Sequence, residues 1–308
     1  MPILRSLFIG LSKNRALRHF VECSRACSRL SSRFVAGMDL EDALRIAETL
    51  NKQNIAVTLD SLGENVTSEE EARQAAEIYH KILDALAKRK LNANISVKLS
   101  QMGLGLSLEL AEELVGRLAE HAHATGNFVR VDMEDSLLTE VTLAIVRRLH
   151  ARAGMQGAIG VVVQASLYRS RTDIDQLVAE GIRVRLCKGA YLEPATIAFA
   201  RKAEVDENYI RLSCILLESP IYHGLATHDG VMIAAAKSFA QQHHIDPSRF
   251  EFQMLYGIRR DLQRKLVNEG YNVRVYVPFG RAWYPYFMRR LAERPANVLF
   301  LAKNLFRF

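Results

Sequence analysis

A strand-then-helix unit that recurs eight times between residues 54 and 293 constrains the fold more than any other feature. Short runs rich in Val and Ile alternate with longer segments in which apolar residues return every three to four positions. Strands this apolar are typical of parallel sheets that are covered on both faces. The expected strands are 54–59, 95–100, 128–134, 159–165, 182–188, 222–229, 251–257 and 273–280. Eight such units over about 240 residues predict an α/β fold, a (β/α)8 barrel.

An open, doubly wound sheet is the alternative architecture for alternating strands and helices. Its dinucleotide-binding form needs GxGxxG after the first strand, but DSLGE follows the first strand here. The only GxG, at Gly103 and Gly105, lacks the third glycine. Residues 1–50 have helical periodicity throughout, with Asp39 as an expected N-cap. We therefore expect a single domain over 1–308, with N-terminal helices in 1–50 and the barrel in 51–308.

The composition indicates a globular protein that does not bind nucleic acid. The chain is 49% hydrophobic and 24% charged, and no apolar run approaches the roughly 18 residues of a membrane-spanning helix. The N-terminal MPILRSLFIGLSKNR has no cleavage site, so we expect no signal peptide. The four cysteines have no zinc spacing and indicate a reducing cytoplasm. The net charge of +7 is scattered, which suits an anionic cofactor, an acidic substrate or a membrane surface.

Polar side chains gather at the ends of the expected strands, where a barrel of this type has its active site. They include Asp60, Glu64, Lys98, Asp132, Glu134, Gln164, Arg185, Lys188, Thr227, His228, Asp229, Glu251, Gln253 and Tyr276. Buried charges are costly unless they are paired, so their convergence predicts a polar ligand site. Structural alternatives stay open: Lys98 pointing out into the helix layer, Asp132 capping a loop, Gln164 satisfying a backbone group, and His228 packing in the core. No HExxH or GxSxG motif indicates a metal or a serine nucleophile.

The C-terminal stretch WYPYFMRRLAERPAN carries a second candidate site. Tyr286, Arg289, Arg290 and Glu293 follow the spacing i, i+3, i+4 and i+7, which places them on one face of a helix. Two adjacent guanidiniums backed by a carboxylate suit a small anionic ligand. The alternative is the solvated face of an ordinary amphipathic helix.

Eight short motifs occur in an order that resembles a known family. They are SVKLS, VDME, VVVQASLYRS, RVRLCKGAYLEP, ATHD, FEFQMLYG, RVYVPFG and YFMRRLAERPAN, and they span residues from about 54 to 300. In these motifs the sequence resembles proline dehydrogenase in its monofunctional bacterial form. The resemblance implies a distorted (β/α)8 barrel with FAD at the carboxyl ends of the strands. It also implies a last helix, at about 281–293, that covers the barrel mouth as a lid.

The resemblance also assigns roles to individual residues. Asp132 and Arg185 are the expected catalytic residues, with Arg185 set against the reactive edge of the flavin. The expected substrate contacts are Lys98, Leu255, Tyr276, Tyr286, Arg289, Arg290 and Glu293, in which the paired arginines grip the carboxylate and Glu293 orients them. The expected cofactor contacts are Met133, Gln164, Arg185, Lys188, Gly189, Ala190, Thr227 and His228. A tyrosine at 276 looks like the proline-specific version. Met133 and Cys187 depart from residues seen in other members.

The activity that the resemblance implies is oxidation of L-proline to 1-pyrroline-5-carboxylate, the first step of proline degradation to glutamate. Hydride passes to FAD, a quinone-type acceptor takes the electrons, and a separate 1-pyrroline-5-carboxylate dehydrogenase takes the product. We expect a cytoplasmic protein, and Leu4, Leu7, Phe8 and Leu11 on one helical face favour peripheral contact with the inner face of the membrane. The alternative is a helix packed on the barrel. Competing functions are a reductase barrel of the methylenetetrahydrofolate type, a lysine-based aldolase using Lys98 or Lys188, and a non-catalytic binding barrel.

Overall fold

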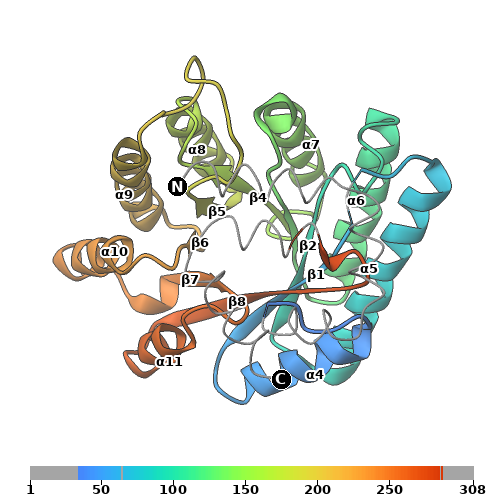
Figure 1. Cartoon of the computed structure of the whole chain (residues 1–308), viewed down its shortest axis with the longest axis horizontal. Helices are drawn as coiled ribbons and strands as arrows, with labels where there is room; N and C mark the ends of the chain where they lie inside the picture. The colour runs from blue at the N-terminus through green and yellow to red at the C-terminus, as the bar shows by residue number, and fades with distance from the viewer. Residues whose placement is uncertain (1–33, 64, 285, 287–308) are drawn as a thin grey trace, which may run out of the picture.

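Eight parallel strands close into a barrel in chain order in this computed structural model, which describes residues 34–63, 65–284 and 286. Each strand pairs with its neighbour in sequence, and β1 closes the ring by pairing with β8. The strands are β1 (Ala56–Ser61), β2 (Ala93–Val97), β3 (Val129–Val131), β4 (Ile159–Gln164), β5 (Arg183–Cys187), β6 (His223–Ala226), β7 (Phe250–Leu255) and β8 (Asn272–Phe279). The helices surround the strands (Figure 1). The predicted (β/α)8 barrel is confirmed.

Two of the helices that follow strands begin at serine caps. Ser68 and Ser107 each accept a hydrogen bond from a backbone N–H three residues later, at 3.2 Å, which satisfies a donor that the helix leaves unpaired. Asp39 takes the expected N-cap position, but its side chain makes no capping bond. The helices are α4 (Leu40–Asn51), α5 (Glu69–Arg89), α6 (Leu108–Ala124), α7 (Thr139–His150), α8 (Ser170–Ala179), α9 (Lys202–Glu218), α10 (Gly230–Gln242) and α11 (Arg260–Asn268), with 3-10 turns η1 (Ser136–Leu138) and η2 (Pro247–Arg249).

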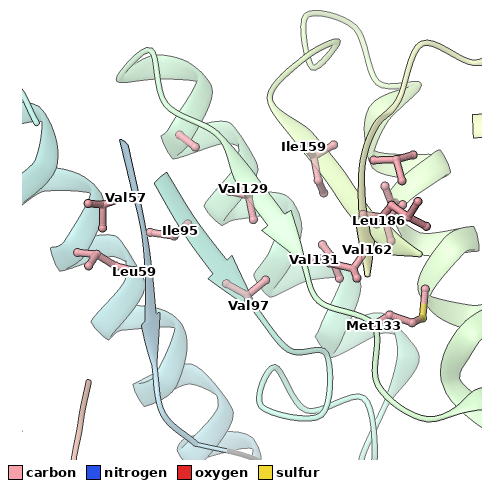
Figure 2. Close-up of a cluster of buried hydrophobic side chains, with 14 of the residues drawn as sticks. Val57, Leu59, Ile95, Val97, Val129, Val131, Met133, Ile159, Val162 and Leu186 are labelled. Carbon is pink, nitrogen blue, oxygen red and sulfur yellow. The ribbon is translucent and has the colours of Figure 1, made fainter. Parts of the chain in front are cut away.

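The hydrophobic core lies between the barrel and its ring of helices. Val57 and Leu59 of β1, Ile95 and Val97 of β2 and Val129 of β3 are fully buried there, as Figure 2 shows. Successive side chains on a strand point to opposite faces, so these residues leave the alternate positions for the barrel interior. Burying each such side chain contributes about 1.5–3 kcal/mol. This layer fixes the strands that carry the polar residues.

Two boundaries differ from the sequence prediction. β3 ends at Val131, although the Asp132 N–H still donates to the Val97 carbonyl at 2.8 Å. Beyond it, the Glu134 side chain bonds Ser100 at 2.9 and 2.6 Å, so side-chain contacts replace regular pairing there. The helix expected from roughly 193 begins at Lys202. The preceding loop is bonded to the loop after β4 instead: the Phe199 N–H donates to the Ser166 carbonyl at 2.8 Å. A backbone N–H that donates to the other loop cannot also donate to a carbonyl one helical turn earlier, so the helix starts later.

Some predictions fall on residues that the structure does not describe. The helices expected within 1–33, including the apolar face from Leu4 to Leu11, lie outside the described residues. So do Glu64, expected after the first strand, and Arg289, Arg290 and Glu293 of the expected lid. Trp283, Tyr284 and Tyr286, in the same stretch, are helical. Within 34–63, 65–284 and 286, no helix is both long enough and apolar enough to cross a membrane.

The interior of the barrel is polar, whereas branched apolar side chains usually fill barrels of this type. Thr58 donates to Asn94 at 2.6 Å, and Arg274 Nη1 donates to the Val57 carbonyl at 2.7 Å. Arg130 Nη1 donates to the carbonyls of Val161 at 3.1 Å and Arg183 at 2.6 Å. Buried polar groups cost little when they are hydrogen-bonded. These bonds therefore allow polar side chains to fill the barrel interior.

Candidate active site

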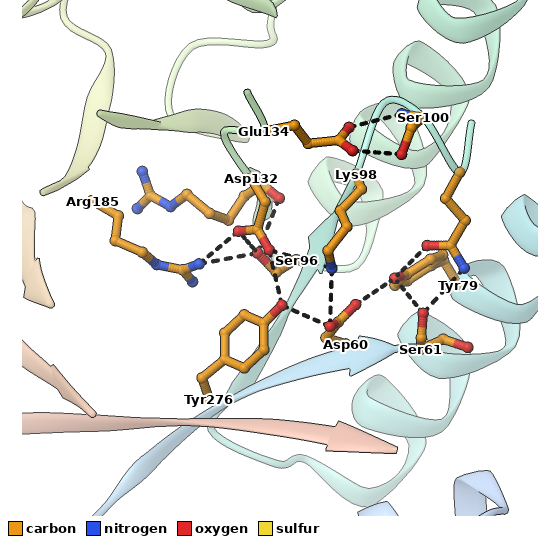
Figure 3. Close-up of polar contacts among 12 residues, drawn as sticks. Asp60, Ser61, Tyr79, Ser96, Lys98, Ser100, Asp132, Glu134, Arg185 and Tyr276 are labelled. Atoms are coloured by element: carbon orange, nitrogen blue, oxygen red, sulfur yellow. Dashed lines mark hydrogen bonds and ion pairs between the residues drawn. The ribbon is translucent and has the colours of Figure 1, made fainter. Parts of the chain in front are cut away.

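Charged side chains from four strands meet at the mouth formed by the carboxyl ends of the strands (Figure 3). Asp60 lies near the end of β1, Lys98 and Asp132 directly follow β2 and β3, and Arg185 lies in β5. Lys98 Nζ is 3.1 Å from Asp60 and 3.8 Å from Asp132, and Arg185 Nη1 is 2.8 Å from Asp132. Lys98 therefore points into the barrel, not out into the helix layer. Two carboxylates and two cations neutralise one another, which offsets the free-energy cost of removing them from water.

Tyr276 of β8 joins the two carboxylates. Its hydroxyl is 2.7 Å from Asp60 Oδ2 and 2.8 Å from Asp132 Oδ2. Burial, and then the charges of Asp132 and Asp60, raise the pKa of Tyr276 well above its usual value, so the phenol stays neutral and donates. A phenol has a single hydrogen, so the two carboxylates need further donors, which include Lys98 and Arg185.

A surrounding layer of hydrogen bonds holds these groups in place. Ser96 Oγ donates to Asp132 at 2.5 Å and accepts from Arg185 Nη1 at 3.1 Å. Arg185 Nε donates to Gln253 Oε1 at 2.5 Å, and Tyr79 lies 3.1 Å from Asp60. The sequence indicated no role for Ser96. It lies two residues before Lys98, and the alternation of side chains along an extended chain could have indicated that both point to the same side.

Arg185 has one donor that its neighbours do not use. Its Nη2 is buried and has no hydrogen-bond partner among the described residues, although Nε and Nη1 are both bonded. The guanidinium also lies 5.3 Å from the centre of the Tyr276 ring, a cation–π distance. A buried donor that lacks a partner costs free energy, so this nitrogen is suited to a bound molecule.

The residues expected to hold a cofactor lie at the ends of β3 to β6. Gln164 ends β4 and donates from Nε2 to the Glu134 carbonyl at 2.9 Å, and Met133 is buried beside it. The Leu255 N–H donates to His228 Nε2 at 2.8 Å, which fixes the orientation of the ring. The hydroxyl of Thr227, just after β6, accepts from the Asp229 N–H at 3.1 Å. The structure therefore brings these positions to the same mouth as Asp132 and Arg185.

Lys188 and the two residues after it form the exit from β5. Lys188 Nζ contacts Asp206 at 2.6 Å and Asp229 at 2.9 Å, and an ammonium has three donors. Gly189 has φ of +105°, and a Cβ there would lie 2.3 Å from Ser166 Oγ, so only glycine fits. Gly189 and Ala190 are both exposed. The chain thus presents a cation and accessible backbone at one turn.

The remaining predicted site residues lie in different parts of the chain. Leu255 ends β7 half-buried, and Tyr286 is buried, whereas Arg289, Arg290 and Glu293 lie outside the described residues. Glu251, expected among the residues at this mouth, lies near the opposite end of β7. Glu251 and Gln253 point to the same face of β7. Because they are two residues apart, they lie about 6–7 Å apart along the strand axis.

Comparisons with known proteins agree with the geometry. A profile described as "Proline dehydrogenase" matches residues 43–303. The chain is similar to "Proline dehydrogenase 1" of Bacillus subtilis (strain 168), with 42% identity over 98% of this chain and 99% of that protein. It is also similar to a "Proline dehydrogenase" of Deinococcus radiodurans, with 41% identity over 90% of each chain. The structure resembles proline utilization A from Bdellovibrio bacteriovorus, with TM-score 0.81, 25% identity and coverage of 94% of this chain and 36% of that one.

Proposed function

Because this chain belongs to the proline dehydrogenase family, and therefore oxidises proline to 1-pyrroline-5-carboxylate, we propose that the polar barrel mouth is the site of this reaction and that FAD is its cofactor. Family membership confirms the resemblance read from the eight motifs. The observation that supports the location best is the balanced cluster of Asp60, Lys98, Asp132 and Arg185 with the unused donor of Arg185.

The residues at this mouth fit FAD. The orphaned Arg185 Nη2 needs an acceptor, and the turn at Gly189 offers backbone that a side chain would block. The residues that would hold the cofactor are Met133, Gln164, Arg185, Lys188, Gly189, Ala190, Thr227 and His228. Bound FAD supplies the two-electron chemistry of amine oxidation.

The side chains of the mouth have positioning and electrostatic roles in this proposal. Arg289 and Arg290 would clamp the proline carboxylate by charge-assisted hydrogen bonds, with Glu293 orienting them and Tyr286 on the same face. Lys98, Asp132, Leu255 and Tyr276 would wall the ring, which fixes the reacting carbon by orientation. Arg185, braced by Asp132 and Gln253, would stabilise negative charge that develops beside it. Solvent would accept the amine proton.

A lysine nucleophile is a poorer explanation of the same mouth. Nucleophilic lysines are activated by apolar surroundings or by another cation. Lys98 lies against two carboxylates, at 3.1 and 3.8 Å, and so does Lys188, at 2.6 and 2.9 Å. Both environments favour an ammonium that organises other groups.

The proposal extends to the partners and the domain. Electrons would leave to a quinone-type acceptor at the inner face of the membrane, and a separate 1-pyrroline-5-carboxylate dehydrogenase would consume the product. Residues 1–308 would form one barrel domain, with the helix at about 281–293 as a lid. A lid that carries the carboxylate clamp would close when substrate arrives.

The absorption spectrum of the purified protein tests the cofactor. We expect flavin bands that bleach when L-proline is added without oxygen, because proline would reduce the bound cofactor. D-proline is the matched control and should bleach them far more slowly. A colourless protein that binds no added FAD would contradict the proposal.

Replacing Arg289 with Ala should raise the KM for proline at least tenfold, because one of two charge-assisted bonds to the carboxylate is lost. Steady-state kinetics measure the KM, and absorbance measures the flavin content, which should be unchanged. Arg264→Gln, which removes an exposed arginine from α11, is the control. Loss of FAD with unchanged affinity for proline would argue against this placement of the clamp.

A further inference from the structure

The barrel has a second polar opening at the end opposite the candidate active site. A cavity of about 290 Å³ lies among residues that begin the strands or directly precede them. Arg183 begins β5, Asn272 begins β8, and Asn92 and Tyr222 directly precede β2 and β6. The cavity is therefore at the amino-terminal mouth, separated from Arg185 and Asp132 by the polar interior.

Arg183 is held at this opening by aromatic rings. Its guanidinium carbon lies 5.3 Å from the centre of the Phe128 ring and 5.8 Å from that of Tyr222. No ion pair to Arg183 is found within the described part of the chain. Stacking on a ring engages the face of a guanidinium and leaves its in-plane N–H donors available. Arg183 thus presents an oriented fork of donors to the cavity.

The electrostatic balance at this mouth is positive. Arg274 also lines the cavity, but its Nε is 2.8 Å from Glu251. Burial raises the pKa of Glu251, and Arg274, the Gln253 hydrogen bond and the charge of Arg130 together lower it below its usual value. Glu251 thus offsets one arginine, and Arg183 remains uncompensated. Arg130 adds a further charge behind the cavity, where its ring contact with Phe128 measures 4.6 Å. The site lacks a second carboxylate among its lining residues.

Two buried groups report the same positive field. Burial, then the charges of Arg130 and Arg183, lower the pKa of His223 to about 3, so this imidazole stays neutral. Burial and the nearby Arg185, Arg183 and Arg274 lower the pKa of Arg130. A further positive charge is therefore destabilised at this end of the barrel, and a negative charge is stabilised.

We propose that this amino-terminal cavity, built by Arg183, Arg274 and the amides of Asn92 and Asn272, binds a small oxyanion of the phosphate class. Within the cavity, Arg274 uses Nε for Glu251 and Nη1 for the Val57 carbonyl, and Asn272 Nδ2 donates to the Ser248 carbonyl at 3.1 Å, so Arg183 is the principal donor. Donors that converge from separate elements suit a tetrahedral oxyanion. The volume exceeds that of one phosphate, so the group can be inorganic phosphate or a phosphate monoester.

Calorimetric titration of the holoenzyme with inorganic phosphate, at constant ionic strength, tests this site. Arg183→Gln should weaken phosphate binding about tenfold or more, because charge-assisted bonds are lost. Arg264→Gln removes the same charge from the exposed face of α11 and should bind phosphate as the wild type does. Saturating proline should not displace phosphate, because the two mouths lie at opposite ends of the barrel. Methyl phosphate in a parallel titration shows whether an ester is accepted as well as the free ion.

Equal phosphate affinity of Arg183→Gln and wild type would overturn the proposal, and so would competition between phosphate and proline. If Arg183→Gln does not fold, a crystal of the wild-type holoenzyme soaked in phosphate decides the question. Phosphate density against Arg183 supports the site. Density only at other positions, or none, refutes it.

Discussion

Replacing Arg185 with Met should lower kcat for proline oxidation by about two to three orders of magnitude, the usual cost of removing one preorganised electrostatic donor. The structure explains why no neighbour can substitute. Arg185 is 6% exposed, two of its nitrogens are fixed by Asp132, Ser96 and Gln253, and its third has no partner among the described residues. Methionine keeps an unbranched apolar stem and removes the charge and the donors.

The measurement is kcat per bound flavin, so that a loss of cofactor is not mistaken for a loss of catalysis. Arg185→Lys should recover part of the rate, since it restores the charge without the planar fork. Arg264→Gln, an exposed arginine on α11, should stay within about twofold of the wild type, as expected for a surface substitution. Full kcat in a flavin-loaded Arg185→Met enzyme would remove Arg185 from the catalytic site.

Replacing Glu251 with Leu should destabilise the fold by about 3–5 kcal/mol, because it leaves the partly buried charge of Arg274 uncompensated. Glu251 is 4% exposed and accepts bonds from Arg274 at 2.8 Å, Gln253 at 2.5 Å and Tyr222 at 3.1 Å. All three partners lose their acceptor together. Denaturant unfolding of wild type and variant, compared at neutral pH, gives the difference in free energy.

The pH dependence of this difference has a definite sign. Folding lowers the pKa of Glu251 below its usual 4.5, so its contribution is complete above that value. The contribution disappears as pH falls through the lower folded-state pKa, and the two proteins should then converge. Asp175→Ala, which breaks an exposed pair with Arg171, should cost at most about 1 kcal/mol. A loss that small for Glu251→Leu would contradict a buried ion pair.

The sequence predicts the architecture well because the signal for it is local. Val57, Leu59, Ile95 and Val97 are apolar at alternating positions and pack beneath helices, which the period of the pattern shows directly. The depth of a polar residue along its strand is harder to predict. The sequence predicted Glu251 at the same mouth as Tyr276. In the structure, Glu251 lies near the opposite end of the barrel, where it pairs with Arg274.

In the candidate site too, residue identities could be predicted from the sequence, whereas the contacts between them could not. Asp132 and Arg185 were recognisable from family motifs, and the structure brings them within 2.8 Å. Asp60 and Gln253 were visible at strand ends, yet their contacts with Lys98 and Arg185 depend on register across the closed barrel. Such cross-strand contacts have no local sequence signal.

The polar interior makes the residues of this barrel mutually dependent. Hydrogen bonds run from Asp132 through Arg185, Gln253 and Glu251 to Arg274, so the two mouths share one chain of side chains. Substitutions along this chain should be non-additive in double-mutant cycles, unlike substitutions at well-separated apolar positions. Evolution of the active site would then proceed through compensating pairs, and an engineer who alters Arg185 should repair Gln253 and Glu251 in the same step.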